Sequence, residues 1–408
     1  MHTMRRSRLR HSLLALLTLM SASTVALGKT TAADAVPRDT VRLSVMPSRL
    51  EAGAACTGGS TKVVPAVPWE QRNLQLPRTR QFAQGAGVVT VAVVDTGVSL
   101  QAPALAGRVT AVGGAGADCV GHGTFVAGLI AAAPVKGVGF AGVAQQARIV
   151  AVRGTDERGT ATDATVAKGI RAAVDAGAEV IEVSPALPRN SARLRSAVSY
   201  AADRDALIVA AAVPDAPGNA TSSAHPPRDY WPAAEQGVLS VIDVDMQGGR
   251  PQGAFTPRSA DLAAPGDGVI GVGPKGGGHF IGSGASLAAG YVAGTAALVR
   301  SAQPALTAAE TARWLTTTAY PAAIPRLDPY SALASVPGAT HETAGPARDS
   351  PPVRLVRDES GVRATRRALV LAGVGGGLVL VVVWAAVIAP RGRARGWRPA
   401  RDEDSTTG

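Results

Sequence analysis

The 408-residue sequence contains few of the residues from which metal sites and aromatic binding surfaces are built. It has two cysteines and six histidines, and aromatic residues make up 4% of the chain. A zinc site around Cys119 and His122 would need two further ligands. The other histidines are scattered through the chain, at positions 2, 11, 225, 279 and 341. We therefore expect no metal and no other cofactor. The scarcity of aromatic residues also leaves no marker of a substrate subsite.

A basic patch within the main part of the chain is missing as well, although the net charge is +11. Residues 1–36 contain five Lys or Arg and one acidic residue, and residues 351–408 contain ten and five. The net charge that remains for residues 37–350 is +2. Because nucleic-acid binding requires clustered positive charge, we expect no nucleic-acid partner.

The N-terminus has the pattern of a secretory signal peptide. A basic stretch, RRSRLRH (residues 5–11), precedes an apolar stretch from Ser12 to Leu27, and small residues follow. This order of basic, apolar and small residues predicts a signal peptide over residues 1–36. The alternative is an N-terminal anchor that stays in the mature protein.

The C-terminus contains a predicted transmembrane helix. Ala368 to Ala389 is an uncharged apolar run that is long enough to span a bilayer. Arg366 and Arg367 precede it, and five arginines follow between residues 391 and 401. Because the denser basic flank stays inside, the tail at 390–408 is predicted to be cytoplasmic. We expect a single-pass protein of the cell membrane, in contact with lipid, with its main domain outside the cytoplasm.

With that topology, Cys56 and Cys119 favour one disulfide bond, since an extracytoplasmic compartment is oxidising. Two unpaired buried thiols are the alternative. The bond would connect an N-terminal extension, residues 37–67, to a loop about sixty residues later in the chain.

Between residues 68 and 336, strand-like and helix-like segments alternate. Continuous apolar strands are predicted at 88–94, 149–152, 180–183, 207–212 and 238–244. Helices are predicted at 124–132, 164–176, 192–202 and 286–301. This alternation predicts an α/β domain, a doubly wound parallel sheet with helices on both faces. Residues 337–367 form a linker rich in Pro, Gly and Ala, together with the basic flank of the membrane helix.

Three polar residues stand at strand ends or helix starts, where chemistry gathers in such a sheet. Asp95 follows the first strand in the motif Asp-Thr-Gly, which also marks aspartic proteases; those require a second copy, and none is present. His122 lies between two glycines before a helix. Ser286 begins a helix of small residues, where its backbone N–H and the helix dipole could stabilise an oxyanion.

The order Asp, His, Ser in a parallel α/β sheet is the order of subtilisin. The chain resembles a subtilisin-like serine protease in VAVVDTGV, GHGTFVAG, GVGFAGVAQQARIVAVR, DLAAPG and GASLAAGYVAGTAALV, across residues 85–315. The resemblance implies that Ser286 is the nucleophile and His122 the general base, with Asp95 orienting His122.

The signal peptide, the segment PWEQRNL, the cysteine before GHGT and the C-terminal anchor resemble those of mycosins, which are membrane-anchored subtilases of type VII secretion systems. This second resemblance supports the Cys56–Cys119 bond and implies secretion-complex subunits as partners. It also implies that residues 37–67 are not an inhibitory pro-domain, and the segment is too short to fold as one.

Several positions depart from the subtilase pattern. Ala285 replaces the usual Thr, Gly290 the usual Pro, and a buried strand contains Glu182 with Pro185 three residues later. After the strand at 207–212, the usual Gly-Asn pair aligns with Val213 and Pro214. The Asn supplies an oxyanion donor whose loss lowers kcat by about 10²–10³-fold, a value measured in subtilisin itself.

Asn219 and Ser222 are the residues nearby that could replace the missing donor. We therefore predict a serine endopeptidase of reduced activity that acts on proteins or peptides. The alternative is a catalytically impaired structural component of a secretion complex.

Overall fold

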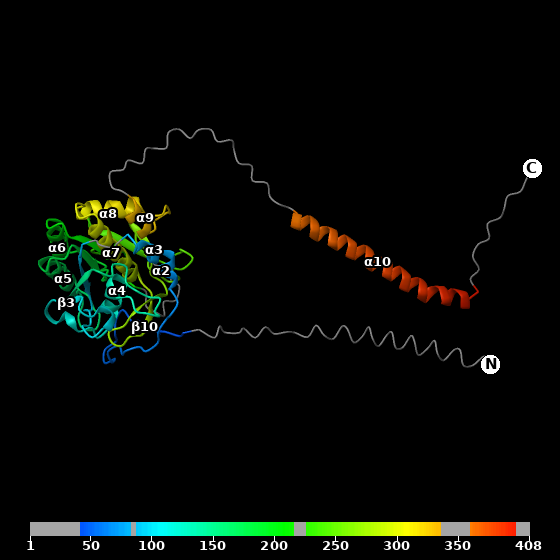
Figure 1. Ribbon diagram of the computed structural model, residues 1–408, viewed down its shortest axis with the longest axis horizontal. Helices are drawn as coiled ribbons and strands as arrows, with labels where there is room; N and C mark the ends of the chain where they lie inside the picture. The colour runs from blue at the N-terminus through cyan, green and yellow to red at the C-terminus, as the bar shows by residue number, and fades with distance from the viewer. Residues whose placement is uncertain (1–40, 83–86, 216–225, 336–359, 397–408) are drawn as a thin grey trace, which may run out of the picture. The chain divides into compact units, whose positions relative to one another are not determined.

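The computed structural model describes residues 41–82, 87–215, 226–335 and 360–396 (Figure 1). The chain divides into two units, with the boundary between Ala339 and Thr340. The predicted signal peptide lies outside the described residues, as do Asn219, Ser222 and most of the predicted linker.

The first unit is built on a seven-stranded parallel sheet with the strand order β3-β4-β2-β5-β6-β7-β8. The strands are β2 (Thr90–Asp95), β3 (Val109–Ala111), β4 (Arg148–Arg153), β5 (Val180–Val183), β6 (Leu207–Ala211), β7 (Leu239–Val244) and β8 (Leu262–Pro265). Central strands such as β5 and β6 are buried along their whole length, as parallel strands covered on both faces should be. The predicted α/β class is confirmed.

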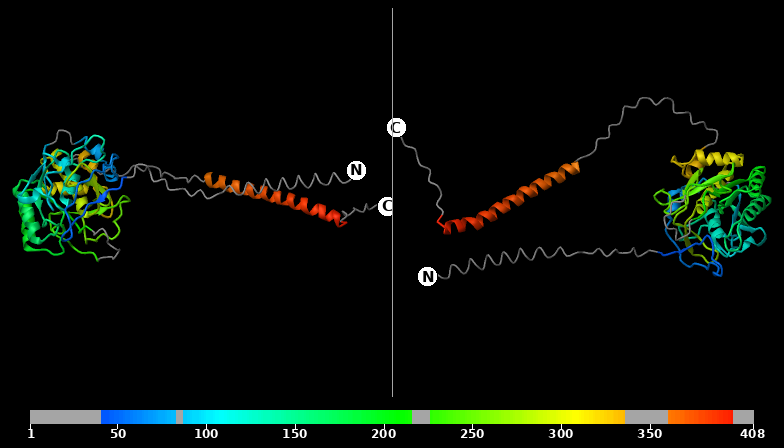
Figure 2. Two further views of the ribbon diagram at one scale, coloured as in Figure 1. Left: turned by 90° about the horizontal axis from the view of Figure 1, so that it is seen from below. Right: turned by 180° about the vertical axis from the view of Figure 1, so that it is seen from behind.

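Helices cover both faces of this sheet (Figure 2). On one face, α4 (His122–Ala131) and α7 (Ala285–Ala302) share a hydrophobic core with Val91 and Val93 of β2. On the other face, α5 (Asp163–Asp175) and α6 (Ala192–Ala202) pack with Ala92 and Val94. Successive residues of β2 therefore serve opposite layers, because side chains alternate along a strand.

The small residues of α7 let this helix lie in the middle of the domain. Every residue from Ala285 to Arg300 is buried. A Cβ atom placed on Gly294 would lie 2.8 Å from Cβ of Val143, so the helix approaches its neighbour closely only because that position is glycine.

Several elements were not predicted from the sequence. They are β8 and β3 at the two edges of the main sheet, and a small sheet of β1 (Ser44–Val45), β10 (His279–Gly282) and β9 (Val269–Val272). The further helices are α2 (Trp69–Asn73), α3 (Leu76–Thr79), α8 (Ala308–Thr317) and α9 (Pro329–Ala334), with short 3-10 turns at Pro103–Leu105 and Gly113–Gly116. Most of these elements are four residues or shorter, which is too short for a periodic pattern to be distinguished.

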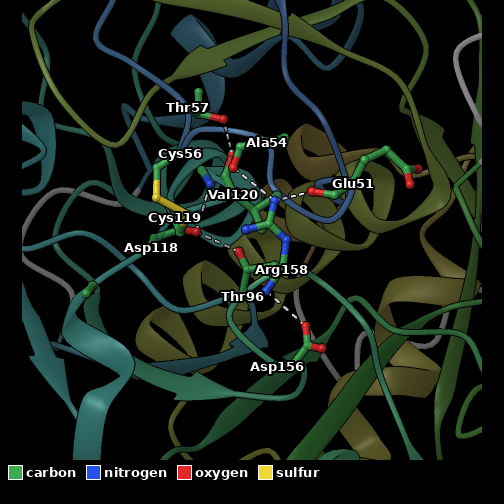
Figure 3. The surroundings of a disulfide bond; sticks show 12 residues. Glu51, Ala54, Cys56, Thr57, Thr96, Asp118, Cys119, Val120, Asp156 and Arg158 are labelled. Atoms are coloured by element: carbon green, nitrogen blue, oxygen red, sulfur yellow. Dashed lines mark hydrogen bonds between the residues drawn. A yellow bond between two sulfur atoms is a disulfide. The ribbon is translucent and has the colours of Figure 1, made fainter.

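The N-terminal extension is attached to the domain through β1 and a disulfide bond (Figure 3). Cys56 is bonded to Cys119, as predicted. Next to the bond, the backbone N–H of Thr57 donates to the carbonyl of Cys119 at 2.9 Å, and its hydroxyl donates to the carbonyl of Val120 at 2.5 Å. The extension thus holds the loop that leads directly to His122.

The second unit contains one described helix, α10 (Ser360–Ala394). Its segment from Arg366 to Gly392 has a mean hydropathy of 2.4 and is long enough to cross a membrane, and it includes the predicted span 368–389. The helix begins and ends beyond that prediction. The last eight residues that we assigned to the linker and the first five of the tail are therefore helical.

Candidate active site

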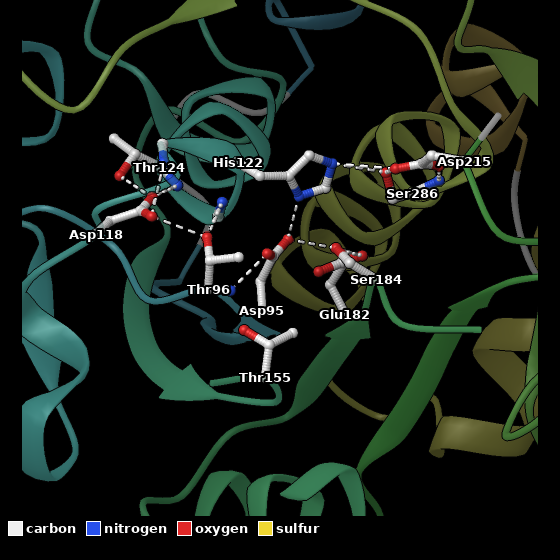
Figure 4. Close-up of polar contacts among 12 residues, drawn as sticks. Asp95, Thr96, Asp118, His122, Thr124, Thr155, Glu182, Ser184, Asp215 and Ser286 are labelled. Carbon is white, nitrogen blue, oxygen red and sulfur yellow. Dashed lines mark hydrogen bonds and ion pairs between the residues drawn. The ribbon is translucent and has the colours of Figure 1, made fainter. Parts of the chain in front are cut away.

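The structure brings Asp95, His122 and Ser286 together (Figure 4). Nδ1 of His122 lies 2.7 Å from Oδ2 of Asp95, and Nε2 lies 3.1 Å from Oγ of Ser286. Asp95 is the last residue of β2, His122 the first residue of α4, and Ser286 the second residue of α7. All three are buried. One imidazole therefore contacts a carboxylate on one side and a hydroxyl on the other, which is the arrangement of a serine protease triad.

The turn before α4 is organised by Asp118, which is almost fully buried. Its carboxylate accepts hydrogen bonds from the N–H of Gly121 at 2.7 Å and from the hydroxyl of Thr96 at 2.8 Å. It also accepts from the N–H and the hydroxyl of Thr124, at 2.9 and 2.6 Å. Asp118 thereby links the start of α4 to the residue after Asp95. We had not predicted a role for it.

Gly123 allows the close approach of α4 to the end of β2. A Cβ atom at this position would lie 2.1 Å from the carbonyl oxygen of Gly97 and 3.0 Å from Cβ of Asp95. Any larger residue would push His122 away from Asp95.

The carboxylate of Asp95 is held by three hydrogen bonds. In addition to His122, it accepts from the N–H of Thr96 at 2.5 Å and from the hydroxyl of Ser184 at 2.6 Å. Burial alone would raise the pKa of Asp95, but the charge of His122 and these hydrogen bonds outweigh it and lower the pKa. Asp95 is therefore an ionised carboxylate that fixes the orientation of the His122 ring.

Glu182 lies behind Asp95 and is fully buried. Its Oε1 is 2.9 Å from the hydroxyl of Ser184, and its Oε2 has no hydrogen-bond partner among the described residues. Burial and the neighbouring charge of Asp95 raise the pKa of Glu182 well above its ordinary value. Ser184 has a single proton, which it donates to the ionised Asp95. A neutral Glu182 can in turn donate to Ser184, and this resolves how a glutamate is accommodated in a central strand.

The residue beside the Ser286 backbone is Asp215, one position beyond Pro214. Its Oδ1 accepts from the N–H of Ser286 at 3.1 Å, and its Oδ2 accepts from the Ser286 hydroxyl at 2.6 Å. Oδ2 is also 3.1 Å from Nε2 of His122. The side chain that lies at this point is therefore that of Asp215, one position after the Pro214 that the alignment places at the donor position.

One feature of the sequence points to Asp215. It is the first polar residue after β6, in the stretch VAAAVPD. Val213 contributes instead to a small hydrophobic cluster with Tyr230 and Ala285. Ala285, which replaces the usual Thr before Ser286, therefore packs against apolar neighbours.

No group of three or more His, Cys, Asp or Glu side chains suited to a metal ion occurs in the described parts of the chain. Nδ1 of His279 accepts a hydrogen bond from the N–H of Val64 at 3.0 Å, so this buried histidine helps to hold the N-terminal extension.

Comparisons with known proteins agree with this geometry. The subtilase family matches residues 86–351. Mycosin-3 of Mycobacterium tuberculosis is 33% identical, covering 86% of this chain and 90% of its own length. Thermitase of Thermoactinomyces vulgaris is 35% identical over 240 residues, covering 56% of this chain and 81% of its own length.

Solved structures are similar as well. The MycP3 protease of the type VII (ESX-3) secretion system is 33% identical with a TM-score of 0.58, over 71% of this chain and 95% of that chain. MycP1 from Mycobacterium smegmatis is 27% identical with a TM-score of 0.60, over 80% and 98%. The chain therefore belongs to the subtilase family, as a mycosin-like serine protease.

Proposed function

We propose that this protein is a membrane-anchored endopeptidase that hydrolyses peptide bonds through Asp95, His122 and Ser286. The observation that carries the proposal is the continuous contact from Asp95 through the His122 ring to the Ser286 hydroxyl. In catalysis, Oγ of Ser286 attacks the carbonyl carbon of the scissile bond while Nε2 of His122 accepts its proton. His122 then donates this proton to the leaving amine, and water repeats the sequence on the acyl-enzyme.

The oxyanion formed in this reaction has one backbone donor, the N–H of Ser286 at the start of α7. The positive end of the helix dipole adds to its effect. No asparagine stands beside it within residues 87–215 or 226–335, since Asp215 occupies that place. We expect turnover below that of a subtilase with both donors, by up to about 10²–10³-fold.

The proposed membrane topology places the peptidase domain outside the cytoplasm and the C-terminal tail inside. The apolar segment of α10 and the arginines between 391 and 401 support this orientation. The Cys56–Cys119 bond also supports it, because structural disulfides persist in oxidising compartments.

The proposed substrates are proteins that pass through a secretion complex, whose subunits would be partners of this protein. Support comes from the similar MycP1 and MycP3 proteases, which belong to the ESX-1 and ESX-3 type VII secretion systems.

A second candidate function is a structural role in such a complex with little or no catalysis. The carboxylate of Asp215 favours it, because a negative charge next to the Ser286 N–H opposes the formation of an oxyanion.

Labelling with a serine-directed fluorophosphonate separates the two functions. The full chain in detergent should be labelled, and Ser286→Ala should abolish the labelling. Ser283→Ala is the matched control, because that hydroxyl is exposed and bonds only the N–H of Gly268. If neither the wild type nor Asp215→Asn is labelled between about pH 5 and pH 9, the protease function is wrong and the structural one remains.

A further inference from the structure

The carboxylate of Asp215 lies beside the groups of Ser286 and His122 that would act on a substrate. Its side chain is only 9% exposed. The N–H and the hydroxyl of Ser286 both donate to it, and Nε2 of His122 lies 3.1 Å from its Oδ2. These three groups are the oxyanion donor, the nucleophile and the general base of a serine protease. The position depends on Gly284, where a Cβ atom would lie 2.0 Å from Oδ1 of Asp215.

The contacts define how many protons the site holds. Nδ1 of His122 donates to the ionised Asp95, and the Ser286 hydroxyl donates to Asp215. A proton must therefore lie between Nε2 and Oδ2, because two unprotonated acceptors would repel each other at 3.1 Å. Consistent with this, burial lowers the pKa of His122, but Asp95 and Asp215 outweigh the burial and raise it well above its ordinary value.

The shared proton can occupy either atom without any change in the total charge. With the proton on Nε2, His122 cannot accept the Ser286 proton, and the ionised Asp215 covers the Ser286 N–H. With the proton on Oδ2, His122 is a free base that lies 3.1 Å from the Ser286 hydroxyl, and Asp215 is a neutral acid with an O–H to donate.

We propose that Asp215 is a further catalytic residue of this protease: it accepts the proton from Nε2 of His122 and, as a neutral acid, donates a hydrogen bond to the oxyanion. In this step the Nε2–H bond breaks and an Oδ2–H bond forms. His122 then takes the proton of Ser286 as its oxygen attacks the substrate, and Asp215 keeps its own proton throughout. The arrangement found in the structure is the resting form of the site.

The surroundings of Asp215 are rich in acidic groups. Glu182 of β5 and Asp243 of β7 both interact electrostatically with it, and Asp95 of β2 lies on the other side of the His122 ring. Among the described residues, the cationic groups are His122 of α4 and Arg250, which pairs with Asp243, while α7 presents the uncharged Ser286. A proton kept by the Asp215–His122 pair limits the negative charge of this buried site.

This inference rests on the proposed protease function, and three forms of the full chain in detergent test it: the wild type, Asp215→Asn and Asp215→Ala. An Asn side chain can donate a hydrogen bond without first being protonated. The fluorophosphonate labelling rate of Asp215→Asn should therefore exceed that of the wild type at least about tenfold. Ala has no donor, and its rate should fall at least about tenfold below the wild type. Thermal unfolding of each variant verifies that it is folded.

The pH profile gives an independent readout in the wild type. Loss of the shared proton at high pH removes the hydrogen that Asp215 would donate, so the wild-type labelling rate should fall on the alkaline side. Gain of a second proton at low pH leaves His122 unable to act as a base, so the rate should also fall there. Asp215→Asn should keep its rate at alkaline pH.

The proposal is supported if Asp215→Ala is labelled more slowly than the wild type and Asp215→Asn is labelled faster. The labelling rate should also fall at alkaline pH in the wild type but not in Asp215→Asn. Any other order, or a wild-type rate that stays constant to about pH 9, overturns it while leaving the protease function intact. An Ala variant faster than the wild type would mean that Asp215 only blocks the site. Labelling absent from all three forms would overturn the protease function and this inference with it.

Discussion

Glu182 shows how a single buried residue can affect both the stability and the active site of this protease. It lies in β5 between Val93 of β2 and Val209 of β6, at the centre of the main sheet. Its hydrogen bond to Ser184 continues through Asp95 to His122. A neutral acid at this point lets Ser184 direct its proton to Asp95, which keeps the His122 ring in place.

The neutral state of Glu182 should make stability depend on pH. The pKa of Glu182 is raised in the folded protein. Glu182 therefore makes its full contribution to the free energy of unfolding below its ordinary pKa of 4.5, and this contribution is lost as the pH rises toward the pKa in the folded protein. Glu182→Gln cannot ionise, so its gain in unfolding free energy over the wild type should grow by about 1.4 kcal/mol per pH unit in that window. Thermal unfolding from about pH 4 to pH 8 measures this gain.

The control for this experiment is Glu157→Gln, which makes the same chemical change at an exposed position. It should show no such pH-dependent gain. If Glu182→Gln is instead less stable than the wild type at pH 8, Glu182 is ionised in the folded protein and its assigned role in the chain of hydrogen bonds is wrong.

At the scale of elements, the N-terminal extension supports the start of α4 from outside. The disulfide joins residues 63 positions apart, and the two hydrogen bonds of Thr57 hold the same loop. Asp118, next to Cys119, binds the first turn of α4 from the inside. His122 therefore stands on a helix end that is fixed on both sides.

Removal of the disulfide should loosen this helix end. In the double variant Cys56→Ser, Cys119→Ser, we expect the free energy of unfolding to fall by about 2–4 kcal/mol, since the unfolded chain is no longer constrained. Amide hydrogen exchange at Gly121 and Gly123 should speed up, and the labelling rate of Ser286 should fall. Chemical reduction of the wild type is the matched comparison and should shift stability by the same amount. Unchanged exchange at Gly121 and Gly123 would show that the hydrogen bonds of Asp118 and Thr57 hold the loop without the disulfide.

In the whole molecule, the apolar helix α10 and the catalytic residues belong to different units of the chain. Its apolar segment lies in a unit of its own beyond Ala339. By length and composition this helix can cross a membrane, so its proposed anchoring role can be tested separately from catalysis.

A chain that ends after Ser335 should leave the membrane fraction and become soluble, while the full chain should stay in the membrane after alkaline carbonate washing. A chain that ends after Ala394 keeps all of α10 and is the control, which should remain in the membrane. If the shorter chain also resists carbonate, the N-terminal apolar stretch is a retained anchor rather than a cleaved signal peptide.

The α/β class, the main strands and helices, and the three motifs that contain Asp95, His122 and Ser286 could be predicted from the sequence alone. These features are local: a buried strand is recognisable from its own apolar residues, and a motif from its neighbours along the chain. The two cysteines needed a further argument from compartment and family, and the structure agrees with the pairing.

The residues that surround Asp95, His122 and Ser286 could not be predicted, because they come together only in the folded chain. Asp215 contacts a residue 71 positions away, and Ser184 bonds Asp95 across 89 positions. Both contacts exist because parallel strands end at one edge of the sheet, where short loops without a periodic pattern meet. The alignment of a run of alanines could not determine which side chain of such a loop turns inward. That choice depends on the space left by Gly284 and on the hydrogen-bond donors of Ser286, which come near only in the folded chain.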